Sequence, residues 1–166
     1  MPKKSFCLVV RWGLLLNQIS QSNPGWAARL LRNYGQAEKN IAVGFPSDSP
    51  AAGASYPDGT RVVEVAVDNE FGTSIAPARP FLAKSEPALE QAQRDILSSA
   101  VTVINEGQNV DRELNLLGQM AVGIVQSTIT ELRDPPNAAK TIAEKGSSNP
   151  LIDTGLMRQT VNYSIR

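Results

Sequence analysis

The side chains that could do chemistry in this sequence are carboxylates, lysines and serines, because the usual catalytic nitrogen and sulfur groups are scarce. The chain has no histidine, which excludes Ser-His-Asp and Cys-His catalysis and histidine metal sites. Its single cysteine, Cys7, lies in the apolar run 6–10, where a packed and inert thiol is expected. The designs that remain are a carboxylate pair, a Ser-Lys arrangement and a metal cluster made only of carboxylates.

One carboxylate pair has a spacing that catalysis could use. Asp68 and Glu70 are two residues apart beside Gly72, and on a strand both side chains would point to the same face. A glycan hydrolase could use them as acid and nucleophile, whereas solvated or ion-paired carboxylates are the ordinary alternative. The sequence has no phosphate-binding glycine loop, dinucleotide fingerprint, calcium loop or CxxC pair. We therefore predict a protein that is not an enzyme and that binds no cofactor or metal.

The charge balance argues against a protein that captures nucleic acid electrostatically. Sixteen Lys and Arg residues balance sixteen Asp and Glu residues, so the formal net charge is zero. No run approaches the roughly 18 apolar residues that span a bilayer, and Arg11 interrupts the apolar N-terminal stretch. We expect a soluble protein made in the cytoplasm, and 166 residues favour one compact domain.

Two long amphipathic helices have the clearest periodicity. The first is expected from residue 85 or 86 to residue 107, and the second from residue 109 or 111 to the residues before Pro135. Gly118 and Gly123 would each cost the second helix about 1 kcal/mol relative to Ala. We expect a close backbone crossing at these glycines to explain them.

The other predicted elements are shorter. A helix is expected over 24–34, a strand over 41–45, and a C-terminal strand over 159–165, where apolar and polar residues alternate. Residues 6–20 fit either a strand or a helix, and residues 62–67 are equally ambiguous. The C-terminal strand is expected to pack its apolar face on the two long helices and to leave one backbone edge for a neighbouring subunit.

Two long polar loops, 46–60 and 134–150, connect these elements, and the second contains a helical turn around residues 141–143. Loops of this length are usually functional, so both are candidate contact arms. The predicted fold class is α+β, with two long helices packed on a small, mostly antiparallel sheet. We divide the chain into an N-terminal segment, 1–22, whose structure is left open, and a single domain, 23–166.

The segment between Phe71 and Phe81 combines a turn with a rigid strap. Gly72 can take a positive φ, and the prolines at 77 and 80 restrict the backbone around Arg79. The two aromatic rings either clip this connector to the core or form part of a presented contact surface.

Arg79 is the polar group that this strap would hold in place. An extended arginine suits a bidentate contact with a carboxylate, and the candidates are Glu70, Asp153 or an acid of a neighbouring subunit. Asp153-Thr154-Gly155 has two interpretations, a helix N-cap with a permissive glycine or an assembly contact.

Four segments, in this order and spacing, resemble the neck and tail-completion proteins of tailed bacteriophages. They are EVAVDNEFGT at 64–73, PARPFL at 77–82, PPNAAKTIAEKG at 135–146 and PLIDTGL at 150–156. The resemblance covers residues 60–166, extends more weakly to the strand at 41–45, and leaves the first twenty residues unmatched.

The resemblance implies a structural, non-catalytic subunit of the virion, in which residues 62–70 form a short helix. Such a subunit repeats in a ring at the head-to-tail junction, and we prefer six copies over twelve. The ring would join a head-completion or connector ring to a tail-terminator or tail-tube protein and let DNA pass without sequence-specific binding. A charge-balanced subunit suits such a conduit, because each phosphate held by Lys or Arg would resist sliding.

The candidate assembly residues lie between positions 70 and 155 of the chain. They are Glu70, Phe71, Gly72, Thr73, Arg79, Pro80, Phe81, Asp153, Thr154 and Gly155. The alternatives are a tail terminator ring protein, a phage-encoded glycan hydrolase that uses the carboxylate pair, and, against the charge balance, a nucleic-acid-binding module.

Overall fold

The computed structural model describes residues 6–11, 39–106 and 108–166, and the helix predicted over 24–34 lies outside this part. Within the described residues, the elements follow one another as two strands, five helices and a last strand. They are β1 (Phe6–Arg11), β2 (Asn40–Phe45), α3 (Val62–Phe71), α4 (Phe81–Asn105), α5 (Asp111–Glu131), α6 (Ala139–Lys145), α7 (Leu156–Thr160) and β3 (Asn162–Ile165).

The three strands form one antiparallel sheet in the order β1-β2-β3, which confirms the α+β fold class. The strand predicted over 41–45 is β2, the central strand, in which Ile41 and Val43 are fully buried. β1 lies within the segment 1–22 that we set apart from the sequence, yet it pairs with β2 and belongs to the same sheet. Residues 6–11 of the ambiguous run 6–20 are therefore a strand, and residues 12–20 lie outside the described residues.

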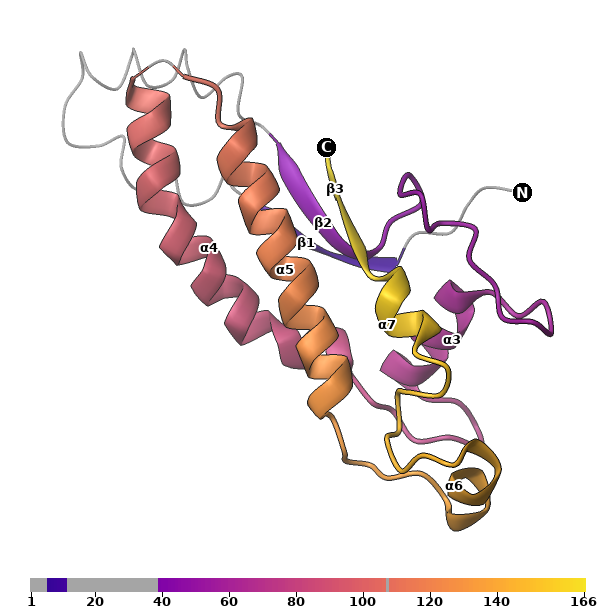
Figure 1. The fold of residues 1–166 in the computed structure, drawn as a ribbon. Helices are drawn as coiled ribbons and strands as arrows, with labels where there is room; N and C mark the ends of the chain where they lie inside the picture. Colours follow the sequence, from indigo (N-terminus) through magenta and orange to yellow (C-terminus); the bar gives the residue numbers. More distant parts are fainter. Residues whose placement is uncertain (1–5, 12–38, 107) are drawn as a thin grey trace.

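α4 and α5 form a long hairpin that lies against one face of the sheet (Figure 1). They begin and end close to the predicted helices, except that α4 starts at Phe81, four residues before Ser85. The facing parts of the two apolar stripes that contain Ala100, Leu114 and Leu117 form one core cluster with Ile41. The amphipathic pattern therefore corresponds to the buried faces.

A second core cluster lies where the long helices meet α3 and α7. Phe81 is fully buried there and its ring meets Phe45 edge-on at 6.4 Å between centroids. The ambiguous residues 62–67 are helical, with Val62 and Ala66 in this cluster. Tertiary burial of one helix face overrides the strand preference of the valines.

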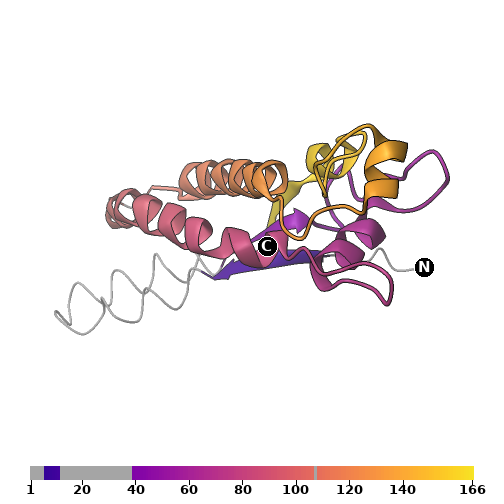
Figure 2. The same cartoon turned by 90° about the horizontal axis from the view of Figure 1, so that it is seen from below.

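The C-terminal strand is shorter than predicted, because residues 156–160 form α7 and β3 begins at Asn162. β3 completes the sheet as an edge strand. Tyr163 and Ile165 pack with the cluster under α4 and α5, and the Tyr163 hydroxyl donates to the Asn115 side chain on α5 at 2.7 Å. Seen from below, α6 and α7 lie on one side of α3, and the segment that links α3 to α4 lies on the other (Figure 2).

The two long polar loops also have the predicted character. Residues 46–61 consist of turns and an isolated bridge between Ser55 and Arg61, and the predicted helical turn at 141–143 lies within α6. Among the described residues, no helix combines the length and the apolar character that crossing a membrane requires.

Candidate assembly site

Glu70 connects the end of α3 to the start of α4. Its side chain is 7% exposed, and its two carboxylate oxygens accept hydrogen bonds from the backbone N–H groups of Leu82 at 2.9 Å and Ala83 at 3.0 Å. These N–H groups are among the four that a helix leaves unpaired at its N-terminus. Glu70 therefore caps α4, and a negative charge there is also favoured by the helix dipole.

The carboxylate pair expected for a hydrolase is not formed in this geometry. Asp68 and Glu70 lie on a helix, not on a strand, and two residues along a helix turn a side chain by roughly 200°. Asp68 is exposed, whereas both oxygens of Glu70 are occupied by backbone donors. The spacing argument was wrong because it assumed an extended backbone.

Gly72 ends α3 in the conformation that the sequence predicted. Its φ is +75°, and a Cβ atom built on it would lie 2.7 Å from the backbone nitrogen of Ala78. The turn after it is closed by Thr73, whose N–H donates to the carbonyl of Ala76 at 2.8 Å and whose hydroxyl accepts from the Ala76 N–H at 3.0 Å. Both the φ and the lack of space require glycine at this position.

Arg79 is buried and holds the long C-terminal connector. Its Nε donates to the carbonyl of Pro135 at 3.0 Å, and its Nη2 donates to the carbonyl of Pro136 and to the side-chain oxygen of Asn137, both at 3.2 Å. Its backbone N–H donates to the carbonyl of Asn69 at 2.6 Å. The planar guanidinium suits several acceptors at once, as lysine would not.

The prediction that Arg79 pairs with a carboxylate of the same chain is therefore wrong. In the part of the chain that is described, neither Glu70 nor Asp153 forms an ion pair with Arg79, and carbonyl oxygens accept its hydrogen bonds instead. Burial lowers the pKa of the Arg79 guanidinium from its ordinary value. A carboxylate of a neighbouring subunit stays a prediction.

Two asparagines that the sequence did not single out continue this network. The Asn137 side chain donates to the carbonyl of Asn149 at 3.2 Å, and the Asn149 side chain donates to the carbonyl of Thr130 at the end of α5 at 3.0 Å. The Asn149 side-chain oxygen accepts from the N–H of Leu151 at 3.0 Å. The available signal was their position next to prolines, where asparagine often hydrogen-bonds the backbone of a turn.

The four segments that carry the phage resemblance thus meet in one place. Segment 64–73 caps segment 77–82 through Glu70, and segment 77–82 holds segment 135–146 through Arg79. Segment 135–146 reaches the start of segment 150–156 through the two asparagines. Residues distant in sequence are joined by hydrogen bonds that the sequence order alone did not predict.

The two phenylalanines that flank the strap have different environments. Phe81 is in the core, as the clip interpretation expects, whereas Phe71 is 70% exposed and forms a T-shaped ring contact with Phe6 at 5.8 Å between centroids. The interpretation of the rings as a hydrophobic anchor of this connector to the core therefore holds for Phe81 alone. Pro80 occupies the N-cap position of α4 and has no side chain that could cap it.

Asp153-Thr154-Gly155 precedes α7 and contains the expected permissive glycine, but Gly155 itself is the N-cap and no side chain caps the helix there. The hydroxyl of Thr154, not the carboxylate of Asp153, accepts from the N–H of Leu156 at 3.3 Å. Gly155 sits at the cap position with a φ of +80°. Asp153 is left exposed to solvent.

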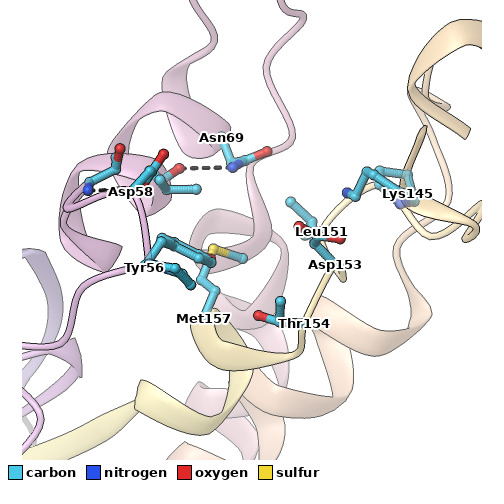
Figure 3. Close-up of a pocket in the computed structure, with 12 residues that line it drawn as sticks. Tyr56, Asp58, Asn69, Lys145, Leu151, Asp153, Thr154 and Met157 are labelled. Carbon is cyan, nitrogen blue, oxygen red and sulfur yellow. Dashed lines mark hydrogen bonds between the residues drawn. The ribbon is translucent and has the colours of Figure 1, made fainter.

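A pocket of about 570 Å³ opens beside this turn (Figure 3). Its lining comes from the 46–61 loop, α3, the end of α6, the connector from α6 to α7, and the start of α7. The lining residues are Tyr56, Pro57, Asp58, Thr60, Val65, Asn69, Lys145, Pro150, Leu151, Asp153, Thr154 and Met157. The sequence had marked two of them, Asp153 and Thr154, as candidates.

Two titratable groups of the pocket respond to partial burial. Burial raises the pKa of the Tyr56 hydroxyl, and the charge of Asp153 raises it further. Burial lowers the pKa of the Lys145 ammonium and the nearby Arg79 charge adds to this, while Asp153 opposes it. Apolar walls thus carry a few polar groups, an arrangement that is common in binding pockets.

Comparisons of the chain with models of protein families, with curated proteins and with solved structures find no match. Function is therefore inferred from the geometry of the chain and from the resemblance of its four ordered segments.

Proposed function

We propose that this chain is a structural subunit of a tailed-phage virion that forms a ring at the head-to-tail junction. The ring joins a head-completion or connector ring to the tail and lets DNA pass through its lumen. Six copies are preferred over twelve, and the subunit has no catalytic role.

One observation carries the proposal: the four segments that resemble neck and tail-completion proteins form one continuous hydrogen-bonded unit. Glu70 and Arg79 are buried and hold backbone groups of other segments, so these residues serve the fold of the subunit. Four sequence motifs whose residues contact one another in the fold are a more specific sign of a family than four separate motifs. The resemblance therefore concerns a tertiary unit.

The charge balance and the open sheet edge are consistent with this function. A net charge of zero gives the subunit as a whole no excess of positive charge that would attract the phosphate backbone. β3 is an edge strand whose outer side pairs with no strand among the described residues. Edge strands and long loops are surfaces on which subunits of a ring can meet.

Localisation in the virion tests the function directly. The expected result of a density map of the assembled particle is this subunit in a closed ring between the head and the tail. Its position on the tail shaft or baseplate, or its absence from particles, would overturn the proposal. A position directly on the last tail-tube ring would instead identify the tail terminator, which is the closest alternative.

A mass measurement tests the copy number. Native mass spectrometry of the 17.9 kDa chain, alone and mixed with the proteins of the adjacent rings, is expected to give a six-copy assembly. Twelve copies would correct the number while leaving the ring itself in place. A chain that stays monomeric in every mixture would contradict a ring.

A further inference from the structure

The loop after α3, residues 72–78, presents an uncharged apolar tip to solvent. Ile75 is 94% exposed, the highest value among the large exposed apolar side chains of the described residues. No charged residue occurs from Phe71 to Ala78. A single exposed apolar residue is ordinary on a protein surface, so exposure by itself says little.

The rigidity of the 72–78 loop distinguishes Ile75 from an ordinary exposed residue. Besides the contacts of Thr73 with Ala76, the Thr73 hydroxyl accepts from the N–H of Ile75 at 3.3 Å. Gly72 fixes one end of the loop, and the backbone bond from Arg79 to Asn69 fixes the other. A loop whose backbone is held in advance loses little conformational entropy when it binds.

The pocket lies on the other side of α3 from this loop. Figure 2 shows the segment between α3 and α4 on one side of α3, and α6 and α7 on the opposite side. Leu151 and Met157 line the pocket and are almost fully buried, and Val65 and Tyr56 add apolar surface. One chain therefore carries an apolar projection and an apolar-walled recess on two different faces.

The charges of the pocket also suit an uncharged occupant. Lys145 and Asp153 bring opposite charges to the pocket lining, and the Asp58 carboxylate accepts a hydrogen bond from the N–H of Thr60 at 2.9 Å. An isoleucine side chain leaves no charge or hydrogen-bonding group unpaired when it enters such a site.

We propose that Ile75 and the 72–78 loop of one copy insert into the pocket between Tyr56 and Met157 of the next copy. Two different patches of the same chain then meet, which is a heterologous contact that propagates head to tail and can close into a ring. This inference deepens the ring function proposed above and rests on it.

Disulfide trapping between separately made variants tests the contact. In a Cys7→Ser background, Ile75→Cys is mixed with Thr154→Cys or with Thr60→Cys, which lie on the pocket lining. Two pocket positions are used because the geometry at one of them could be unsuitable for a disulfide bond. The expected result is a linked dimer in at least one mixture and not in any variant alone, and no linked dimer from either mixture would overturn the proposal.

A homodimer of Ile75→Cys alone would also overturn the proposal, because it would show that two loops meet each other in an isologous contact. The effect of Ile75→Asp is measured with a different cysteine pair, Ala76→Cys on the loop and the pocket-lining cysteine on the other copy. Ile75→Asp is expected to reduce the yield of linked dimer by about tenfold or more, as the loss of an interface anchor does. Ser74→Asp is the matched control, since it adds the same charge at the neighbouring exposed position. Equal effects of the two substitutions would contradict a specific role of Ile75.

The outcome is separable from that of the proposed function. A subunit located in the neck whose loop and pocket cysteines never link would refute this contact and leave the ring function standing. Linked copies of a chain found elsewhere in the particle would support the contact and refute the function. If Ile75→Asp abolished binding to an adjacent ring protein while trapping between copies failed, the loop would contact a different protein and the proposal would be wrong.

Discussion

Glu70 accepts a hydrogen bond from the backbone N–H of Leu82 at 2.9 Å, so a side chain at the end of α3 caps the beginning of α4. An N-cap residue usually provides this acceptor from its own side chain. Pro80 holds the N-cap position here and cannot do so. The start of the longest helix therefore depends on a residue ten positions before the cap.

Replacement of Glu70 by Gln should destabilise the fold. Gln keeps one acceptor oxygen but presents an N–H₂ group to the second backbone donor and removes the charge at the helix start. The expected loss in the free energy of unfolding is about 1–2 kcal/mol, as for other N-cap changes. Denaturant unfolding measures it, and Asp68→Asn on the exposed face of α3 is the control, with an expected change within about 0.5 kcal/mol. Equal losses would contradict the capping role.

Arg79→Ala should reduce the stability of the subunit itself. The substitution leaves the carbonyls of Pro135 and Pro136 without their buried donor, and a hydrogen bond to a charged group contributes about 1.5–3 kcal/mol. Arg79→Lys should recover part of this loss, because an ammonium cannot serve all the acceptors of the planar fork. Thermal unfolding gives the comparison, with exposed Arg94→Ala as control. A monomer of normal stability that fails only to assemble would show that Arg79 serves a neighbour.

Gly72→Ala should impair folding although alanine is the smallest side chain that can be added. The residue would have to keep a φ of +75° while its Cβ lies 2.7 Å from the nitrogen of Ala78. We expect a loss of more than about 1 kcal/mol. Gly59→Ala is a matched control, because Gly59 has a φ of +86° but open space around a Cβ. Similar losses at both positions in denaturant unfolding would assign the effect to φ alone.

Gly118 and Gly123 on α5 should respond to alanine in opposite directions. A Cβ on Gly118 would lie 2.3 Å from the ring of Tyr163, so Gly118→Ala should displace β3 and destabilise the fold. A Cβ on Gly123 meets no atom within 4 Å, and Gly123→Ala should stabilise the helix by up to about 1 kcal/mol. The two changes in melting temperature check this, and a loss at both positions would indicate a further contact at Gly123.

The pair of Asp48 and Arg166 should make the C-terminal strand sensitive to acid. Arg166 donates to both oxygens of Asp48, at 3.0 and 3.2 Å, and this contact lowers the pKa of the carboxyl group. Because the folded pKa lies below the unfolded value, its contribution is present above about pH 4 and is lost as the pH falls through the folded pKa.

Asp48→Asn tests that contribution. The difference in melting temperature between the wild type and Asp48→Asn should be small at pH 7, because the pair is at the surface, and should vanish below the folded pKa. Asp58→Asn, which removes an exposed carboxylate engaged by a backbone N–H, is the comparison. A difference that stays constant with pH would rule out the ion pair as its cause.

The sequence by itself determined the elements whose signal is local. Apolar periodicity placed the two long helices, alternation placed the central strand at 41–45, and Gly72 predicted a positive φ at the end of α3. These features depend on neighbours within a few residues, so the side-chain types and their spacing contain the information.

Only the tertiary structure decided the features that depend on distant partners. Residues 62–67 form a helix because one face is buried beneath Phe81, and α4 begins early because Glu70 reaches its first turn. Gly118 is explained by a ring from β3, whereas a backbone crossing was expected. Arg79 binds carbonyls 56 and 57 residues away, where a carboxylate was expected. Spacing along the chain does not reveal which groups meet across it, because burial and hydrogen bonding are satisfied by whichever partners the fold brings near.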